Sequence, residues 1–158
     1  MQNLLLTICA LASLSSPSLA CTLVAPPARP GETVEQARDK LATEEQQANW
    51  ERSASVSLAK IIQIRLIDEP TVETTFRPVD IVRGALPPDS VVFTGPPVLG
   101  CYAFTIGDWV ILYATPAPQT GGWRVDNVVA TGDVVDARVL QSLKGRTDFD
   151  DLGFRTPE

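Results

Sequence analysis

Between positions 55 and 130, short apolar segments alternate with turn residues, and this pattern limits the fold of the chain more than any other feature. In the first segment apolar and polar residues alternate from Ser55 to Leu66, a period of two that is typical of a strand with one buried face. Later segments are bounded by stretches rich in Pro, Gly and Asp, which favour turns. We therefore predict five strands, at 55–66, 72–83, 90–94, 108–114 and 123–130.

Two residues disturb this pattern. Pro78 has no N–H to donate to a neighbouring strand, so the second strand is expected to lie at an edge or to contain a bulge. Lys60 interrupts the apolar face of the first strand, and a bulge or a change of exposed face explains it better than a catalytic lysine does. Strands bent in this way suit a small barrel.

One helix is predicted on each side of the strands. The first covers about 33–53, because Thr33 and Gln36 form a capping box and a narrow, alanine-rich stripe follows at helical spacing. The second covers about 133–144, starting at Asp133 and ending before Gly145. Its predicted apolar face consists of Val135, Val139, Leu140 and Leu143.

These elements predict a mainly β fold, a five-stranded OB-like barrel with one helix before it and one after it. A β-sandwich is the alternative. No long linker divides residues 21–145, so they are expected to form one domain. The polar and acidic segment 146–158 lacks periodicity and is expected to be a flexible tail.

Residues 1–20 have the features of a secretory signal peptide. An apolar run from Leu4 to Leu14 is followed by small residues, with Ser18 and Ala20 in the pattern of a cleavage site. No later segment has the apolar length of a transmembrane helix. The mature protein is therefore expected to be exported, to the periplasm or the extracellular space.

Composition excludes several classes of function. The net charge of -6 and the lack of a basic cluster argue against nucleic acid as a partner. The chain has no His, which removes the commonest general base and the commonest zinc ligand. No carboxylate pair stands at a spacing that suggests acid–base catalysis, so we expect a protein that is not an enzyme and has no cofactor or metal of its own.

Removal of the signal peptide leaves two cysteines, Cys21 and Cys101. In an oxidising compartment they are expected to form a disulfide, which would close a loop of about 80 residues and stabilise the fold by about 4 kcal/mol. Two free thiols are the first alternative. The second is a lipid on Cys21, for which Ala20 fits and Ser18 does not, and which would leave Cys101 unpaired.

Four stretches carry a resemblance to a known family. They are Cys21-Thr22 at the mature N-terminus, "ASVSLAKIIQI", "FRPVDIVRG" and "GCYAFTIGDWVILYA". In this order they resemble the N-terminal domain of the tissue inhibitors of metalloproteinases and the related netrin-like modules, in a bacterial secreted version. The resemblance covers about 21–130 and implies an OB fold.

The resemblance also implies a mode of action. In this family the amine and carbonyl of the first cysteine chelate the zinc of a target protease, and that cysteine is disulfide-bonded to one before a late strand. Cys21 and Thr22 match the start and Cys101 matches the partner, while Val24 lies in the apolar stretch that follows. The family has further cysteines, including one where Leu23 stands here, so two of the usual clamps on this inhibitory ridge are missing.

The sequence thus predicts a secreted or periplasmic binding module, with metalloprotease inhibition through Cys21, Thr22 and Val24 as the specific hypothesis. The alternative is a structural or interaction protein of the cell envelope, stapled by its disulfide or anchored by a lipid. Trp109, Tyr113 and Trp123 could form a sugar-stacking face, but aromatics at such strand positions are more often core residues.

Overall fold

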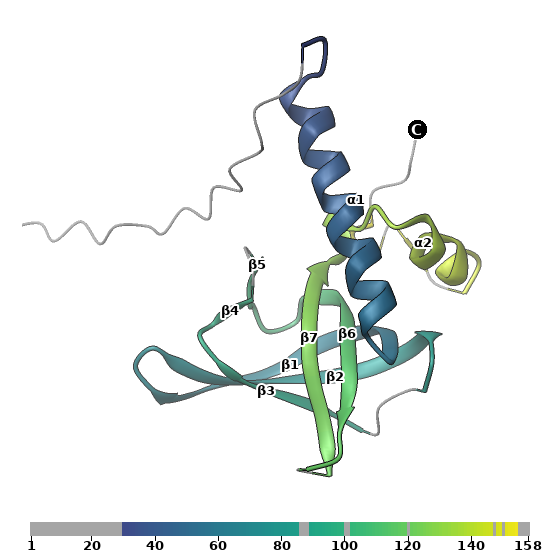
Figure 1. Cartoon of the computed structure of the whole chain (residues 1–158). Coiled ribbons are helices and arrows are strands. Elements are labelled where there is room, and N and C mark those ends of the chain that lie inside the picture. Colours follow the sequence, from purple (N-terminus) through teal and green to yellow (C-terminus); the bar gives the residue numbers. More distant parts are fainter. Residues whose placement is uncertain are drawn as a thin grey trace, which may run out of the picture.

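The computed structural model describes residues 30–85, 89–99, 102–119, 121–146, 148–149 and 151–154. They form a mainly β structure, in which a five-stranded antiparallel sheet is accompanied by one helix before it and one after it (Figure 1). The predicted class, the five strands and the two flanking helices are confirmed.

The strands of the main sheet follow the order β3-β2-β1-β6-β7. Their bounds are Ser55–Asp68 for β1, Thr71–Arg83 for β2, Val91–Gly95 for β3, Trp109–Ala117 for β6 and Gly122–Ala130 for β7. In Figure 1, β6 and β7 run across the long β1–β2 hairpin, so the sheet is strongly bent. The edge strands β3 and β7 come close to each other, but no hydrogen-bonded pairing joins them within the described residues.

Strand β1 is buried on both faces along its first half, although the sequence pattern predicts one buried face. Ser57, Ala59 and Ile61 lie on one side and are fully buried. Val56 and Leu58 lie on the other side and are equally inaccessible, because the C-terminal part of the chain covers them. The serines predicted to face solvent are therefore interior residues.

The two faces of β1 belong to two separate hydrophobic clusters. The first core lies inside the bend of the sheet and contains Ala59, Ile61, Phe76, Val91, Phe104, Val110, Leu112, Ala114 and Val128. The second core lies between the sheet and the C-terminal segment and contains Val56, Leu58, Ile111, Tyr113, Val134, Val139, Leu143 and Phe154. Trp109 packs against the second core and Trp123 against the first, so with Tyr113 the core interpretation of the aromatics is confirmed.

Bulges explain where the alternation of β1 fails. The register between β1 and β2 shifts between Ile61 and Gln63, so Ile62 is an extra residue. After this extra residue, the side chains point to the opposite face from the one that the sequence pattern predicts, and the apolar Leu66 is exposed. A second shift lies opposite Pro78, which confirms the bulge predicted there, although β2 is an inner strand.

Helix α1, Val34–Arg52, begins with the predicted capping box. The Thr33 hydroxyl accepts a hydrogen bond from the Gln36 N–H at 3.1 Å, and the Gln36 side chain accepts one from the Thr33 N–H at 2.9 Å. Figure 1 shows the helix rising from the sheet, with its N-terminal end clear of the strands. Most of its buried residues, Gln46 and Asn49 among them, lie in the C-terminal half.

The second helix is shorter than predicted. A 3₁₀ turn occupies Thr131–Asp133, and helix α2 covers Ala137–Leu143. Its N-cap is Asp136, whose carboxylate accepts a hydrogen bond from the Arg138 N–H at 2.9 Å. The expected start at Asp133 is wrong, because Val134 turns into the second core and a continuous helix would not place it there.

In the segment expected to be a flexible tail, Phe149, Leu152 and Phe154 pack against the body. Phe154 is buried in the second core, and its ring stacks on Phe149 with the centroids 4.8 Å apart. The Phe154 N–H donates to the Phe149 carbonyl at 3.0 Å, and the Thr131 hydroxyl donates to the Leu152 carbonyl. Residues 155–158 lie outside the described part of the chain.

Gly84 lies where β2 turns away from the sheet, with a φ of 79° that favours glycine. A Cβ at this position would overlap the carbonyl oxygen of Ala54, whereas one at Gly107, whose φ is 99°, would meet nothing within 4 Å.

We expect Gly107→Ala to lower the free energy of unfolding by about 1–2 kcal/mol through backbone strain alone. Gly84→Ala should cost about 1–3 kcal/mol more, because the contact with Ala54 is added. Urea unfolding of both variants tests this, and equal losses would contradict the structure.

Candidate functional site

The site residues predicted from sequence lie outside the described residues. Cys21, Thr22 and Val24 precede the first described position, and Cys101 falls in a gap. The disulfide and the inhibitory ridge are therefore not placed. In the chain, Cys101 lies between Leu99 and Tyr102, the paired ends of two short strands that the sequence analysis missed, β4 (Val98–Leu99) and β5 (Tyr102–Ala103).

The β4–β5 hairpin is anchored to the first core by aromatic contacts. Phe104 follows β5 and is buried, and its N–H donates to the Pro97 carbonyl at 3.0 Å, which closes the hairpin. Its ring meets three others edge to face, with centroids 5.5 to 6.0 Å apart. The partners are Phe76, Phe93 and Tyr102. The hairpin that brackets Cys101 in the sequence is thus held by packing.

A polar contact adds to this anchorage. The Tyr102 hydroxyl donates a hydrogen bond to the carboxylate of Asp108, the residue before β6. Burial, this hydrogen bond and the negative charge of Asp108 raise the pKa of Tyr102 far above its ordinary value. Tyr102 therefore keeps its proton, and its role here is to hold β5 against the sheet.

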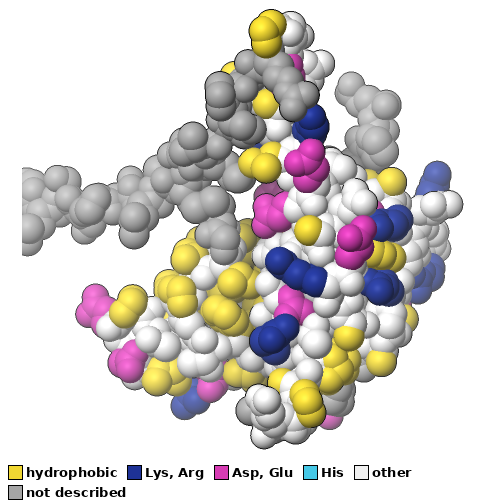
Figure 2. Space-filling view, in the orientation of Figure 1, with side chains coloured by type: hydrophobic (Ala, Val, Ile, Leu, Met, Phe, Trp, Pro, Cys, Tyr) yellow, Lys and Arg dark blue, Asp and Glu magenta, His cyan; other side chains and the backbone are white. Residues whose placement is uncertain are grey.

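Apolar side chains gather on the surface around this hairpin. Figure 2 shows them below α1, in the region where Figure 1 places β4 and β5. Val98 contributes with 40% of its surface exposed, and Leu99 and Tyr102 are half-buried against the first core. An exposed apolar surface of this kind suits contact with another molecule.

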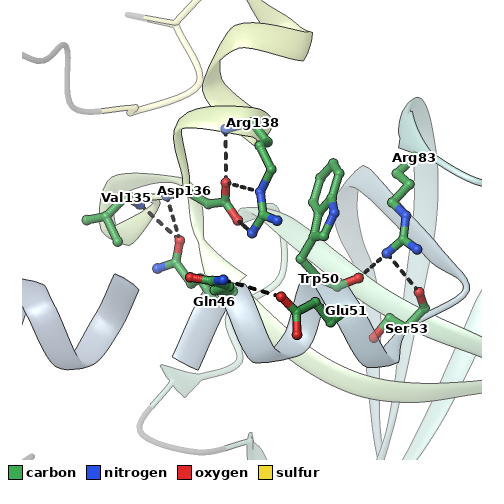
Figure 3. Close-up of polar contacts among 9 residues, drawn as sticks. Gln46, Trp50, Glu51, Ser53, Arg83, Val135, Asp136 and Arg138 are labelled. Atoms are coloured by element: carbon green, nitrogen blue, oxygen red, sulfur yellow. Dashed lines mark hydrogen bonds and ion pairs between the residues drawn. The ribbon is translucent and has the colours of Figure 1, made fainter. Parts of the chain in front are cut away.

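A second concentration of polar contacts joins α1 to the start of α2 (Figure 3). The buried side chain of Gln46 makes three hydrogen bonds to the backbone of the segment before α2. Its amide nitrogen donates to the Asp133 carbonyl at 2.8 Å, and its oxygen accepts from the N–H groups of Val135 and Asp136 at 3.0 and 3.1 Å. The Gln46 amide thus hydrogen-bonds both the C=O and the N–H groups of this segment, as the backbone of a neighbouring strand would.

The indole of Trp50 lies between two guanidinium groups (Figure 3). The Arg138 Cζ is 4.6 Å and the Arg83 Cζ 5.3 Å from the ring centroid. Arg83 also donates hydrogen bonds to the carbonyls of Trp50 and Ser53 at the C-terminal end of α1, where a positive charge is favourable. Trp50 and the two arginines therefore tie α1 to both β2 and α2.

Arg138 forms a two-point ion pair with Asp136, with N–O distances of 2.6 and 3.0 Å. Burial acts to raise the pKa of Asp136, but the hydrogen bonds and positive charge of Arg138 outweigh it and hold the pKa below its ordinary value. Asp136 is thus an ionised N-cap, and its charge is paired with that of Arg138.

The chemistry of this junction is structural. The negative charge of Asp136 is balanced by Arg138. The neighbouring Tyr113 is buried, and this burial is the main cause of its raised pKa. Within the described ranges, no group of three or more His, Cys, Asp and Glu residues is placed to hold a metal ion. In the same part of the chain, no helix has the length and apolar character needed to cross a membrane.

The sequence analysis missed this junction. Gln46 stands in a run of polar residues on a helix, where side chains are usually solvated, and no local signal marks it as buried. Trp50, near the end of the same helix, is the one residue that could have indicated the junction from sequence, because arginines elsewhere in the chain can stack on an indole.

Comparison of the chain with models of known protein families and with curated proteins finds no match to either.

We expect Gln46→Ala to lower the free energy of unfolding by about 2–4 kcal/mol, because it leaves buried backbone groups without partners. The matched control is Gln47→Ala at the neighbouring exposed position, which should change it by at most about 0.5 kcal/mol. Urea denaturation measures both. Equal effects would show that the Gln46 hydrogen bonds do not hold the junction together.

Asp136→Asn tests the ion pair while keeping a good N-cap residue. Because the folded pKa of Asp136 is lowered, its stabilisation is complete above the unfolded value of about 3.9 and is lost as the pH falls through the folded value. The variant should therefore be less stable at neutral pH and lose less stability in acid. Unfolding measured from pH 7 to pH 2 checks this, with the exposed Asp39→Asn as control; parallel curves for Asp136→Asn and wild type would contradict it.

Proposed function

We propose that this protein is an exported binding module with an OB-like barrel of the netrin and metalloproteinase-inhibitor kind, and that it is not an enzyme. Strand order supports the barrel in this proposal. In an OB barrel the first strand pairs with the second and the fourth, and the third comes next to the fifth. The order β3-β2-β1-β6-β7, with β3 close to β7 but not hydrogen-bonded to it within the described residues, is compatible with this connectivity.

The β4–β5 hairpin supports a role for the mature N-terminus. A disulfide from Cys21 to Cys101 would bring the first residue of the mature chain to this hairpin, beside the apolar surface around Val98. There the free amine and carbonyl of Cys21 could occupy the open coordination position of a protease zinc. The apolar surface would then contact the protease around its zinc site.

Chain length is compatible with this arrangement. The 19 residues of α1 rise about 28 Å from the sheet. The segment between Cys21 and Pro30 can span about 30 Å when extended. A segment of that reach can return along the whole helix, so the helix between Cys21 and the sheet does not prevent the disulfide.

The second candidate function is that of an anchored envelope module. The projection of α1 favours it, because the N-terminal half of this helix is almost entirely exposed and would act as a spacer. A lipid on Cys21 would then hold the sheet at a distance from the membrane. In this case the amine is blocked, the thiol is used, and zinc chelation is impossible.

The natively processed protein distinguishes the two candidates by its intact mass before and after reduction. The inhibitor requires a chain that starts at Cys21 with a free amine and gains two hydrogens on reduction. Such a chain should inhibit zinc endopeptidases, and adding one residue before Cys21 should abolish inhibition while unfolding stays unchanged. Acyl chains on Cys21, or inhibition that survives the extension, would refute the zinc-chelating mechanism.

A further inference from the structure

The N-terminal half of α1, which Figure 1 shows clear of the strands, carries an apolar face. Val34, Ala37 and Leu41 lie on this face at helical spacing and are called the α1 stripe here. Val34 is 60% exposed and Leu41 is half-buried, but Ala37 has only 5% of its surface exposed. Among the described residues, none of the three belongs to the first or the second core. The low exposure at the centre of the stripe is therefore not due to either core.

The chain turns sharply just before α1. Residues 30 and 31 form a turn, and the φ of Gly31 is 90°. Proline at the second position of a turn and a glycine with positive φ at the third are typical of a type II turn, which reverses the direction of the chain. The helix then begins at Val34, after the Thr33 cap. This geometry favours a preceding segment that runs back beside α1, toward the sheet.

The sequence before this turn suits a stiff, extended segment. Residues 24–30, "VAPPARP", contain three prolines and no glycine. This composition favours polyproline II structure, which has three residues per turn and rises about 3.1 Å per residue. Val24, Pro27 and Pro30 would then lie on one face of the segment. Because prolines already restrict the unfolded chain, such a segment loses little conformational entropy when it packs.

The repeats of the two elements match. One turn of polyproline II rises about 9 Å, and Val34 and Leu41 are about 10 Å apart along the helix axis. With Pro30 beside Val34 at the turn, Pro27 therefore comes level with Leu41. Ala37 lies between these two levels, and its small side chain lets a proline ring approach the helix closely. A narrow stripe of this kind suits a single extended chain better than the face of a sheet.

We propose that residues 24–30 of the same chain pack as a polyproline II segment along the α1 stripe, with Pro27 against Ala37 and Leu41. The packing supports a half-helix that would be marginal by itself, and it accounts for the low exposure of Ala37. It would also return Cys21 toward the sheet, which favours the disulfide over the spacer. The packing itself depends on neither, because it does not involve the Cys21 amine or thiol.

The direct test is an NMR measurement on the full processed chain. Nuclear Overhauser contacts are expected between the ring protons of Pro27 and the methyl groups of Ala37 and Leu41. In a mixture of isotope-labelled and unlabelled protein, these contacts should arise within one chain. Their absence would overturn the proposal. Contacts found only between chains would also overturn it, because they would assign the α1 stripe to a second copy.

Two matched double variants test the energetic contribution of the segment without changing the sequence of α1. Pro26→Gly with Pro27→Gly should speed amide hydrogen exchange of residues 38–43 at least about fivefold, because the stiff segment and its contact are both lost. Ala25→Gly with Ala28→Gly adds the same two glycines away from the Pro27 face and should change this exchange much less. Equal effects of the two pairs, or no effect of the proline pair, would overturn the proposal. Protease inhibition is not the readout, so failure here would leave the proposed function untouched.

Discussion

Burial of β1 on both faces is the constraint on which the rest of the fold depends. A strand that contributes to two cores needs cover on both sides, and the bend of the sheet supplies only one of them. The C-terminal segment must therefore fold back over the outer face, and Val134, Leu143 and Phe154 do so. This explains why residues past the last strand pack firmly despite their polar composition.

The link between α1 and the C-terminal segment depends on a different kind of interaction. Gln46 and Trp50 hold the helix through an amide and two guanidinium groups, where a globular helix more often uses an apolar stripe. The alanine-rich stripe seen in the sequence is too narrow to bury much surface, and the structure uses it little. Directed polar contacts fix the position of this helix more closely than a few alanines could.

The sequence alone predicts the strands well, because alternation and turn residues are local signals. It fails where distant parts of the chain meet. Ser57 is polar yet buried, since a small side chain is needed inside the bend, and Leu66 is apolar yet exposed, since a bulge at Ile62 changes the face. The predicted site at Cys21 and Cys101 lies outside the described residues. The burial of Gln46 depends on a distant segment, since its contact at Asp133 is 87 positions away in the chain.

The attachment of α1 mainly by its C-terminal half has a thermodynamic consequence. The first turns of the helix, from Val34 onward, are stabilised mainly by their own backbone hydrogen bonds and by the Thr33 cap. A helix segment of that length is marginal in water by itself. Gln46 and Trp50 lie outside these turns, so unwinding of the first turns would leave the junction with the C-terminal segment intact and need not accompany the cooperative unfolding of the sheet.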